Sequence, residues 1–252
     1  MKIGIIGTGH IGASLVRKLS EAGHDVKVAN SRGPETIADD LLTHGARAVT
    51  AEQAATDVEV LVLSVPLSAI PGLADLVKRL LEQATVVETS NYYPQRDGAE
   101  LLPEGIVESL WVSEQLGRPV AKAWNAIGSA SLATNGRPQG AEGRIALPVA
   151  ADRDQDKKIA MQLVEQTGFD AHDAGSLAES WRQQPGTPCY GTDLTLEQLP
   201  AALAAADREQ APVRRDIIVQ IFTTWLGAGT NPDAEWGVAM ARLVECGPDF
   251  QF

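Results

Sequence analysis

Short apolar runs alternate with longer amphipathic stretches through the first two thirds of the chain. The short runs are rich in β-branched residues and end at turn-forming residues, which is typical of buried strands. In the stretches between them, apolar residues recur at helical spacing. The predicted strands span residues 2–6, 25–30, 58–65, 85–88, 120–124, 144–149 and 169–173. The predicted helices span residues 10–22, 34–43, 69–83 and 154–167.

This alternation predicts a parallel sheet with helices on both faces, because each parallel connection needs a crossover segment. We expect an α/β fold of the Rossmann type, a doubly wound and mainly parallel sheet, over residues 1–174. Residues 175–252 are predicted to form a small, mainly helical C-terminal region, since Gly, Pro and Thr there give way to further amphipathic stretches. Three helices are predicted in that region, at residues 196–208, 216–225 and 234–246.

Composition narrows the possible partners. The chain has 33 acidic residues against 21 Lys and Arg, a formal net charge of -12, which disfavours nucleic acid as a partner. Cys189 and Cys246 lie far apart without metal-ligand spacing, so we expect no disulfide and no metal site, and a location in the reducing cytoplasm. The apolar run at residues 2–6 ends at Gly7, too soon for a signal peptide or a membrane span.

The sequence GTGHIG, residues 7–12, follows the first predicted strand and opens the first predicted helix. In that context a G-x-G-x-x-G motif binds the pyrophosphate of a dinucleotide. Gly7 permits the tight turn, Gly9 lets the backbone approach the pyrophosphate, and Gly12 lets the helix pack on the strand. The free N–H groups at the N-terminus of the helix then attract the phosphates.

The end of the second predicted strand indicates which dinucleotide is bound. An NAD site usually has Asp or Glu there, which accepts hydrogen bonds from the ribose and repels a 2′-phosphate. This chain has Asn30, Ser31 and Arg32 instead. An amide, a hydroxyl and a guanidinium can all donate to a phosphate, and Arg can also stack on adenine. The pattern therefore predicts NADP(H).

Further candidate residues lie where later strands reach the same edge of the sheet, at which ligands of open α/β sheets bind. Ser64, Val65 and Pro66 end the third strand, and we expect the stretch to meet the ribose or nicotinamide. Asn91, in the sequence NYYP, ends the next strand, and Ser129, in AWNAIGSAS, follows another. We interpret the tyrosines of NYYP and Trp124 as packing residues.

Several motifs resemble, in order and spacing, the NADP-binding domain of coenzyme F420-dependent NADP oxidoreductases. They are GIIGTGHIG, ANSRGP, SVPLSAI, TSNYYP, KAWNAI and DAGSLAESW, and the resemblance extends over residues 1 to about 182. The cytoplasmic domain of STEAP-type metalloreductases is similar too. The chain departs from the deazaflavin enzymes in lacking the basic residue that can follow the Ser-Arg pair. We expect no counterpart of the metalloreductases' membrane helices in this chain.

The resemblance implies roles for individual residues. The pyrophosphate contacts fall on Thr8, Gly9, His10 and Ile11, and the 2′-phosphate contacts fall on Ser31 and Arg32. The nicotinamide-side contacts fall on Val65, Ala69, Asn91 and Ser129.

The sequence leaves the hydride acceptor open. Reduction of a carbonyl needs a proton donor beside the substrate oxygen. Candidates are few: the last lysine is Lys158, His172 is interpreted as structural, and Tyr190 is the best remaining donor. Direct hydride transfer to a deazaflavin, such as coenzyme F420, or to a flavin needs no acid at the reacting carbon, because the protein only aligns two rings.

Three hypotheses therefore stay open. The first, which we favour, is reduction of a deazaflavin or flavin by NADPH with no catalytic side chain. The second is reduction of a small imine or carbonyl, and the third is a module that senses NADP(H) without turnover. Stretches 217–225 and 238–244 are too apolar for an exposed appendage, so we expect them to cover the active-site edge or to form a homodimer contact.

Overall fold

The computed structural model describes residues 1–103, 105–227 and 230–246; residues 228–229 and 247–252 of the predicted C-terminal region lie outside the described residues. Its sheet has the strand order β3-β2-β1-β4-β5-β6-β7-β8. Neighbouring strands pair in parallel except β6 and β7, which are antiparallel. The strands are β1 (Lys2–Ile6), β2 (Asp25–Ala29), β3 (Arg47–Ala48), β4 (Val60–Leu63), β5 (Thr85–Glu88), β6 (Ala121–Lys122), β7 (Ala146–Ala151) and β8 (Asp170–Asp173).

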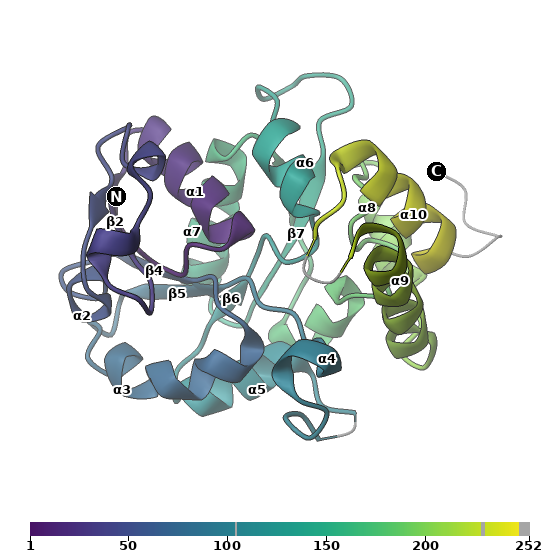
Figure 1. Cartoon of the computed structure of the whole chain (residues 1–252), viewed down its shortest axis with the longest axis horizontal. Coiled ribbons are helices and arrows are strands. Elements are labelled where there is room, and N and C mark those ends of the chain that lie inside the picture. The colour runs from purple at the N-terminus through teal and green to yellow at the C-terminus, as the bar shows by residue number, and fades with distance from the viewer. Residues whose placement is uncertain (104, 228–229, 247–252) are drawn as a thin grey trace.

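Helices cover both faces of this sheet. They are α1 (His10–Glu21), α2 (Ala51–Ala54), α3 (Ala74–Val77), α4 (Pro94–Asp97), α5 (Glu108–Leu116), α6 (Ser129–Thr134), α7 (Asp154–Gln166), α8 (Leu199–Ala204), α9 (Gln210–Leu226) and α10 (Ala234–Glu245). Short 3₁₀ segments are η1 (Pro34–Thr36), η2 (Asp39–Leu41), η3 (Leu67–Leu73) and η4 (Leu177–Gln183). Figure 1 shows α1, α6 and α7 on one side of the sheet and α3 and α5 on the other.

Two apolar layers hold the sheet between these helices. On one face the core joins Leu15 of α1 and Leu163 of α7 to the strands, and on the other it joins Trp111 of α5 and Leu67 to them. Every residue of β4 and β5 is buried, as expected for strands covered on both faces. The predicted doubly wound, mainly parallel α/β fold is confirmed.

Two predicted helices are wrong. Residues 34–43 form only the 3₁₀ turns η1 and η2, although Ile37 and Leu41 are buried at the spacing that suggested a helix. Residues 69–83 form η3 and then the short α3, because Pro71 lies inside the segment and cannot donate a backbone hydrogen bond. The strand predicted at 120–124 is shorter in the structure, where only β6 forms. Helix α5 and strand β3 were not predicted.

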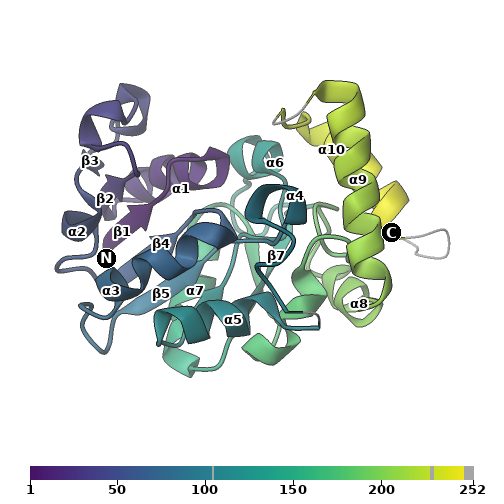
Figure 2. The same ribbon diagram turned by 60° about the horizontal axis from the view of Figure 1, so that its bottom comes forward.

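The C-terminal helices stand beside the carboxyl ends of the strands. Figure 2 shows α9 and α10 next to each other, across from α4 and α6. Phe222 and Trp236 join α9 to α10, with ring centroids 5.4 Å apart. Ile218 of α9 is buried, whereas Trp225 is 77% and Leu243 70% exposed. Among the described residues, none of the helices has both the length and the apolar character needed to span a bilayer.

Candidate functional site

A cavity of about 800 Å³ opens between the carboxyl edge of the sheet and the helices α9 and α10. Its walls come from the turns after β1, β4 and β5, from the start of α6, and from both C-terminal helices. The predicted nucleotide-binding residues that line it are Gly9, His10, Ile11, Ser64, Val65, Pro66, Asn91 and Ser129. Other predicted residues lie outside its lining: Gly7 and Thr8 in the turn after β1, Gly12 in α1, Asn30, Ser31 and Arg32 after β2, and Ala69 in η3.

The glycine-rich turn has the geometry of a phosphate cradle. Gly7 has φ +109°, and a Cβ there would lie 2.0 Å from the Ser64 carbonyl oxygen. A Cβ on Gly12 would lie 2.1 Å from the Gly7 carbonyl oxygen, whereas one on Gly9 would meet nothing within 4 Å. Helix α1 begins directly after Gly9, whose position has no side-chain cap. The turn therefore leaves open space at the positive end of a helix, as a bound pyrophosphate requires.

The turn after β2 is organised by Asn30. Its side-chain Nδ2 donates to Thr36 Oγ1 at 2.9 Å, and its Oδ1 accepts from the backbone N–H of Arg32 at 2.9 Å. The side chains of Ser31 and Arg32 are exposed at the tip of this turn. Asn30 thus shapes the loop, and the hydroxyl and guanidinium beside it are free to face a ligand.

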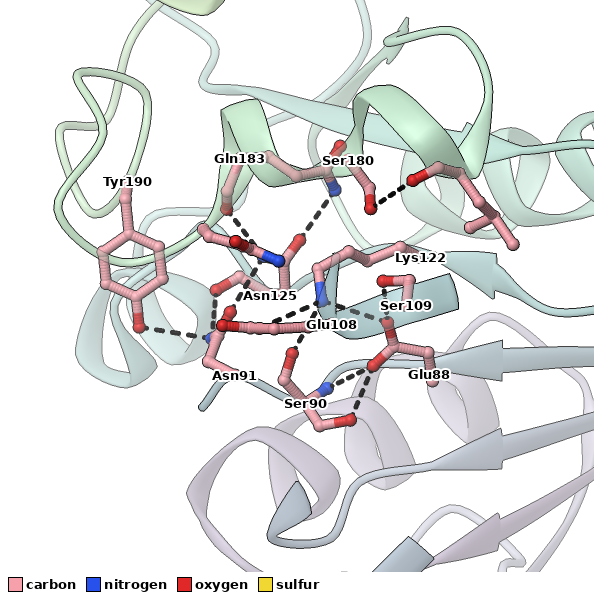
Figure 3. Close-up of polar contacts among 12 residues, drawn as sticks. Glu88, Ser90, Asn91, Glu108, Ser109, Lys122, Asn125, Ser180, Gln183 and Tyr190 are labelled. Carbon is pink, nitrogen blue, oxygen red and sulfur yellow. Dashed lines mark hydrogen bonds and ion pairs between the residues drawn. The ribbon is translucent and has the colours of Figure 1, made fainter. Parts of the chain in front are cut away.

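A buried amide network lies at the end of β5 (Figure 3). Asn91 Nδ2 donates to the Asn125 carbonyl oxygen at 2.9 Å, and Asn125 Nδ2 donates back to Asn91 Oδ1 at 3.0 Å. Gln183 Nε2 donates to Asn125 Oδ1 at 2.8 Å. The network links the turn after β5, the turn after β6 and η4, so it fixes the wall of the cavity at Asn91.

Beside Asn91 lies a buried charged cluster, which the sequence reasoning missed (Figure 3). The Lys122 Nζ is fully buried and lies 3.0 Å from Glu88 Oε1 and 2.8 Å from the Ser90 carbonyl oxygen. Glu88 Oε2 accepts from the Ser90 N–H at 2.7 Å and from its hydroxyl at 2.6 Å. Burial raises the pKa of Glu108, whose Oε2 lies 3.8 Å from Lys122 Nζ, to about 7. Lys122 and Glu88 both form hydrogen bonds with the backbone of Ser90, and the cluster thereby positions Asn91.

Two tyrosine hydroxyls meet at the cavity wall. The Tyr93 and Tyr190 hydroxyl oxygens are 2.7 Å apart, and Asn91 Nδ2 donates to the Tyr190 oxygen at 3.3 Å. Burial raises the pKa of Tyr93 to about 12 and also raises that of Tyr190 well above its ordinary value. Both phenols are therefore protonated at neutral pH. Tyr93, interpreted from the sequence as a packing residue, thus brings a hydroxyl to the site as well.

Other aromatic and histidine candidates have different positions. Trp124 is buried, lines one end of the cavity, and donates from Nε1 to Thr167 Oγ1 at 3.1 Å. His172 lies in β8, outside the cavity lining, and burial lowers its pKa. Cys189 and Cys246 are both buried, free thiols.

Part of the chain is similar in sequence to a known protein family and to a protein of Escherichia coli. Residues 2–92 match the family described as NADP oxidoreductase, coenzyme F420-dependent. The protein YjhV of Escherichia coli strain K12 is 41% identical over 101 residues, which make up 40% of this chain and 72% of that protein. The matched family segment runs from β1 through the Asn91 turn, and so contains both turns that are predicted to bind phosphate.

Two crystal structures resemble the fold over most of the chain. The hypothetical protein SMa0349 of Sinorhizobium meliloti is 28% identical, with a TM-score of 0.65, over 77% of this chain and 95% of that one. A protein of Arthrobacter sp. FB24, proposed to be an F420-dependent NADP reductase, is 21% identical, with a TM-score of 0.59, over 71% of this chain and 87% of that one. The second likeness shows a common fold.

Proposed function

The chain belongs to the coenzyme F420-dependent NADP oxidoreductase family, and we propose that it transfers a hydride between NADPH and a deazaflavin or flavin ring. It is an NADP-dependent oxidoreductase; the acceptor is the proposed part. The supporting observation is the cavity, which continues from the phosphate cradle past Asn91 to an apolar wall on α9 and α10.

The residues present fit the nucleotide at three places. The open space at Gly9 beside the start of α1 would hold the pyrophosphate, and Ser31 and Arg32 would hold the 2′-phosphate. Val65 and Asn91, which line the cavity, would contact the nicotinamide side. NADPH supplies the hydride and its electron pair when it is bound.

The far wall of the cavity suits a flat, largely apolar ring. Ile218 and Phe222 of α9 and Val238 of α10 line it, opposite the small residues at 128–130. Small side chains leave room beside the nicotinamide, and the apolar helices exclude water from the reacting atoms. The protein would align two rings for direct transfer, without a covalent intermediate.

A second candidate is reduction of a small imine or carbonyl by NADPH. The observation in its favour is the Tyr93–Tyr190 hydroxyl pair, because such a substrate needs a hydrogen-bond donor at its nitrogen or oxygen.

The deciding experiment mixes the purified protein and NADPH with oxidised coenzyme F420, FMN, FAD, or a panel of cyclic imines and ketones, and follows the nicotinamide absorbance. Rapid oxidation with coenzyme F420 or a flavin is the expected result. Oxidation with only an imine or ketone would favour the second candidate. Tight NADPH binding without oxidation by any acceptor would instead indicate a sensor of NADP(H).

A further inference from the structure

Glu245, the last residue of α10, brings a carboxyl group to the cavity that holds the two tyrosine hydroxyls. Its side chain is 0% exposed and belongs to the cavity lining. Oε1 accepts from the backbone N–H of Gly186 at 3.3 Å, while Oε2 is buried without a hydrogen-bond partner among the residues that the structure describes. A buried polar atom left unpaired costs free energy, so an oxygen kept in this state next to a cavity calls for a ligand.

Packing holds this carboxyl in place, and no ion pair with another described residue contributes. Gly186 has φ +90°, and a Cβ there would lie 1.8 Å from the Ala211 carbonyl oxygen, so the loop runs directly against α9. Arg214 of α9 donates from Nη1 to the backbone carbonyl oxygen of Glu245 at 2.9 Å. Within residues 1–103, 105–227 and 230–246, no salt bridge reaches the Glu245 carboxylate.

This environment favours the acid form of the Glu245 carboxyl over its carboxylate form. Burial raises the pKa of Glu245 well above its ordinary value, while the Gly186 N–H and the Arg214 charge oppose that rise only in part. The charge that Glu245 would carry when ionised also contributes to the raised pKa of nearby groups. Among the described residues, the titratable or charged groups that interact electrostatically with it are Tyr93, Tyr190, Cys189, Cys246 and Arg214.

Resting on the function proposed above, we propose that Glu245 is the general acid of the acceptor site. The acceptor would be a molecule in which a nitrogen or oxygen takes up the electron pair displaced by the hydride and is then protonated. Deazaflavins, flavins, imines and ketones share that chemistry. Tyr190 and Tyr93, whose hydroxyls adjoin the same cavity, would orient that atom by hydrogen bonding.

Bound NADPH would supply a hydride, with its electron pair, from the C–H bond of its dihydronicotinamide, and would be oxidised as the acceptor is reduced. The hydride would form a new bond to the acceptor, whose displaced electron pair would move onto its nitrogen or oxygen. Glu245 Oε2 would give its proton to that atom, would be left as a carboxylate, and would regain a proton from water.

The test compares the unchanged protein with Glu245→Gln and with the matched control Asp193→Asn. Asp193 also has a buried oxygen without a hydrogen-bond partner among the described residues and a pKa raised by burial, but it lies outside the cavity lining. Its φ of +50° is a conformation that Asn tolerates well. Single-turnover NADPH oxidation is followed from the ordinary carboxyl range to well above neutral pH, with coenzyme F420, with FMN and with 2-methyl-1-pyrroline as separate probes.

Glu245→Gln should slow oxidation about 100-fold or more, the usual scale for a lost general acid, and leave NADPH affinity unchanged. In the unchanged protein the rate should fall as pH rises through the pKa of Glu245, and that fall should vanish in Glu245→Gln but persist in Asp193→Asn. Infrared spectroscopy gives a readout independent of turnover. A protonated-carboxyl band should shift when the acceptor binds, and Glu245→Gln should lack that band.

Unchanged rates and pH profile in a folded Glu245→Gln protein would overturn the role of Glu245 while leaving the proposed function intact. An infrared spectrum showing Glu245 ionised at neutral pH would overturn it as well, without recourse to any variant. An unchanged protein that oxidises NADPH with none of the probes would overturn the proposed function, and this inference with it.

Discussion

Arg32→Ala gives the most direct test of nucleotide choice. Arg32 is exposed at the tip of the turn after β2, and its backbone is held by Asn30 Oδ1. No ion pair occupies its guanidinium in the part of the chain that the structure describes. The side chain is therefore available to a 2′-phosphate, which carries about -1.5 to -2 charges at neutral pH.

The expected loss can be estimated from this exposure. A hydrogen bond to a charged group contributes about 1.5 to 3 kcal/mol, and solvent screening at an exposed turn favours the lower half of that range. A loss of about 2 kcal/mol corresponds to roughly 30-fold weaker NADPH binding. NADH lacks the 2′-phosphate, so its dissociation constant should hardly change.

Calorimetric titration of NADPH and NADH at two salt concentrations measures both values. Arg47→Ala is the matched control, because Arg47 is an exposed arginine that pairs with Asp25 at the opposite end of β2. It should leave both affinities unchanged, and the Arg32 effect should shrink at high salt. Equal losses for NADPH and NADH in Arg32→Ala would refute the assignment of this turn to the 2′-phosphate.

Three further predictions concern stability and assembly. Lys122→Met should lower the free energy of unfolding in urea by about 3 to 5 kcal/mol, because Glu88 would lose its buried cation; an unchanged midpoint would contradict this. Burial raises the pKa of Glu108 to about 7, so the folded state binds that proton more tightly and stability should fall as pH rises from the ordinary carboxyl range toward 7. Thermal unfolding should find that fall reduced in Glu108→Gln, and an identical slope would count against it. We also propose a homodimer through the exposed face of α9, which Trp225→Glu should disrupt in light scattering; a chain that is monomeric at every concentration would exclude it.

Local chemistry explains which parts of the fold were predictable. The bounds of β1, α1 and β5 agree with the sequence pattern to within a residue, because strand periodicity and the glycine turn act over a few neighbouring positions. The helix predicted at residues 34–43 is wrong because tertiary packing, and not a local helix, accounts for its pattern. Ile37 and Leu41 have helical spacing, yet Gly33 with φ +102° and the following proline start a 3₁₀ turn, and tertiary packing buries both apolar side chains.

In the candidate site, too, the predictable residues are those with a local sequence signal. Sequence reasoning predicted the cavity-lining residues whose position is set by a motif, such as Gly9 and Asn91, since their place in the fold follows from a strand end. It missed Lys122, whose only local signal was a charge inside the apolar run VAKAW, because its partner Glu88 lies on a neighbouring strand. The sequence around Glu245 contains no local signal that would indicate a buried carboxyl. A carboxyl on an amphipathic helix is normally solvated, and only the packing of α10 against Gly186 encloses this one.

That difference bears on how the acceptor should be sought. The proposed nucleotide half of the site consists of backbone turns, so its chemistry can be predicted from short motifs. The proposed acceptor half would consist of Tyr93, Tyr190 and Glu245, which come from three separate parts of the chain. Burial is the largest cause of their raised pKa values. Acceptor specificity should therefore change with substitutions on α9 and α10 that leave nucleotide affinity untouched.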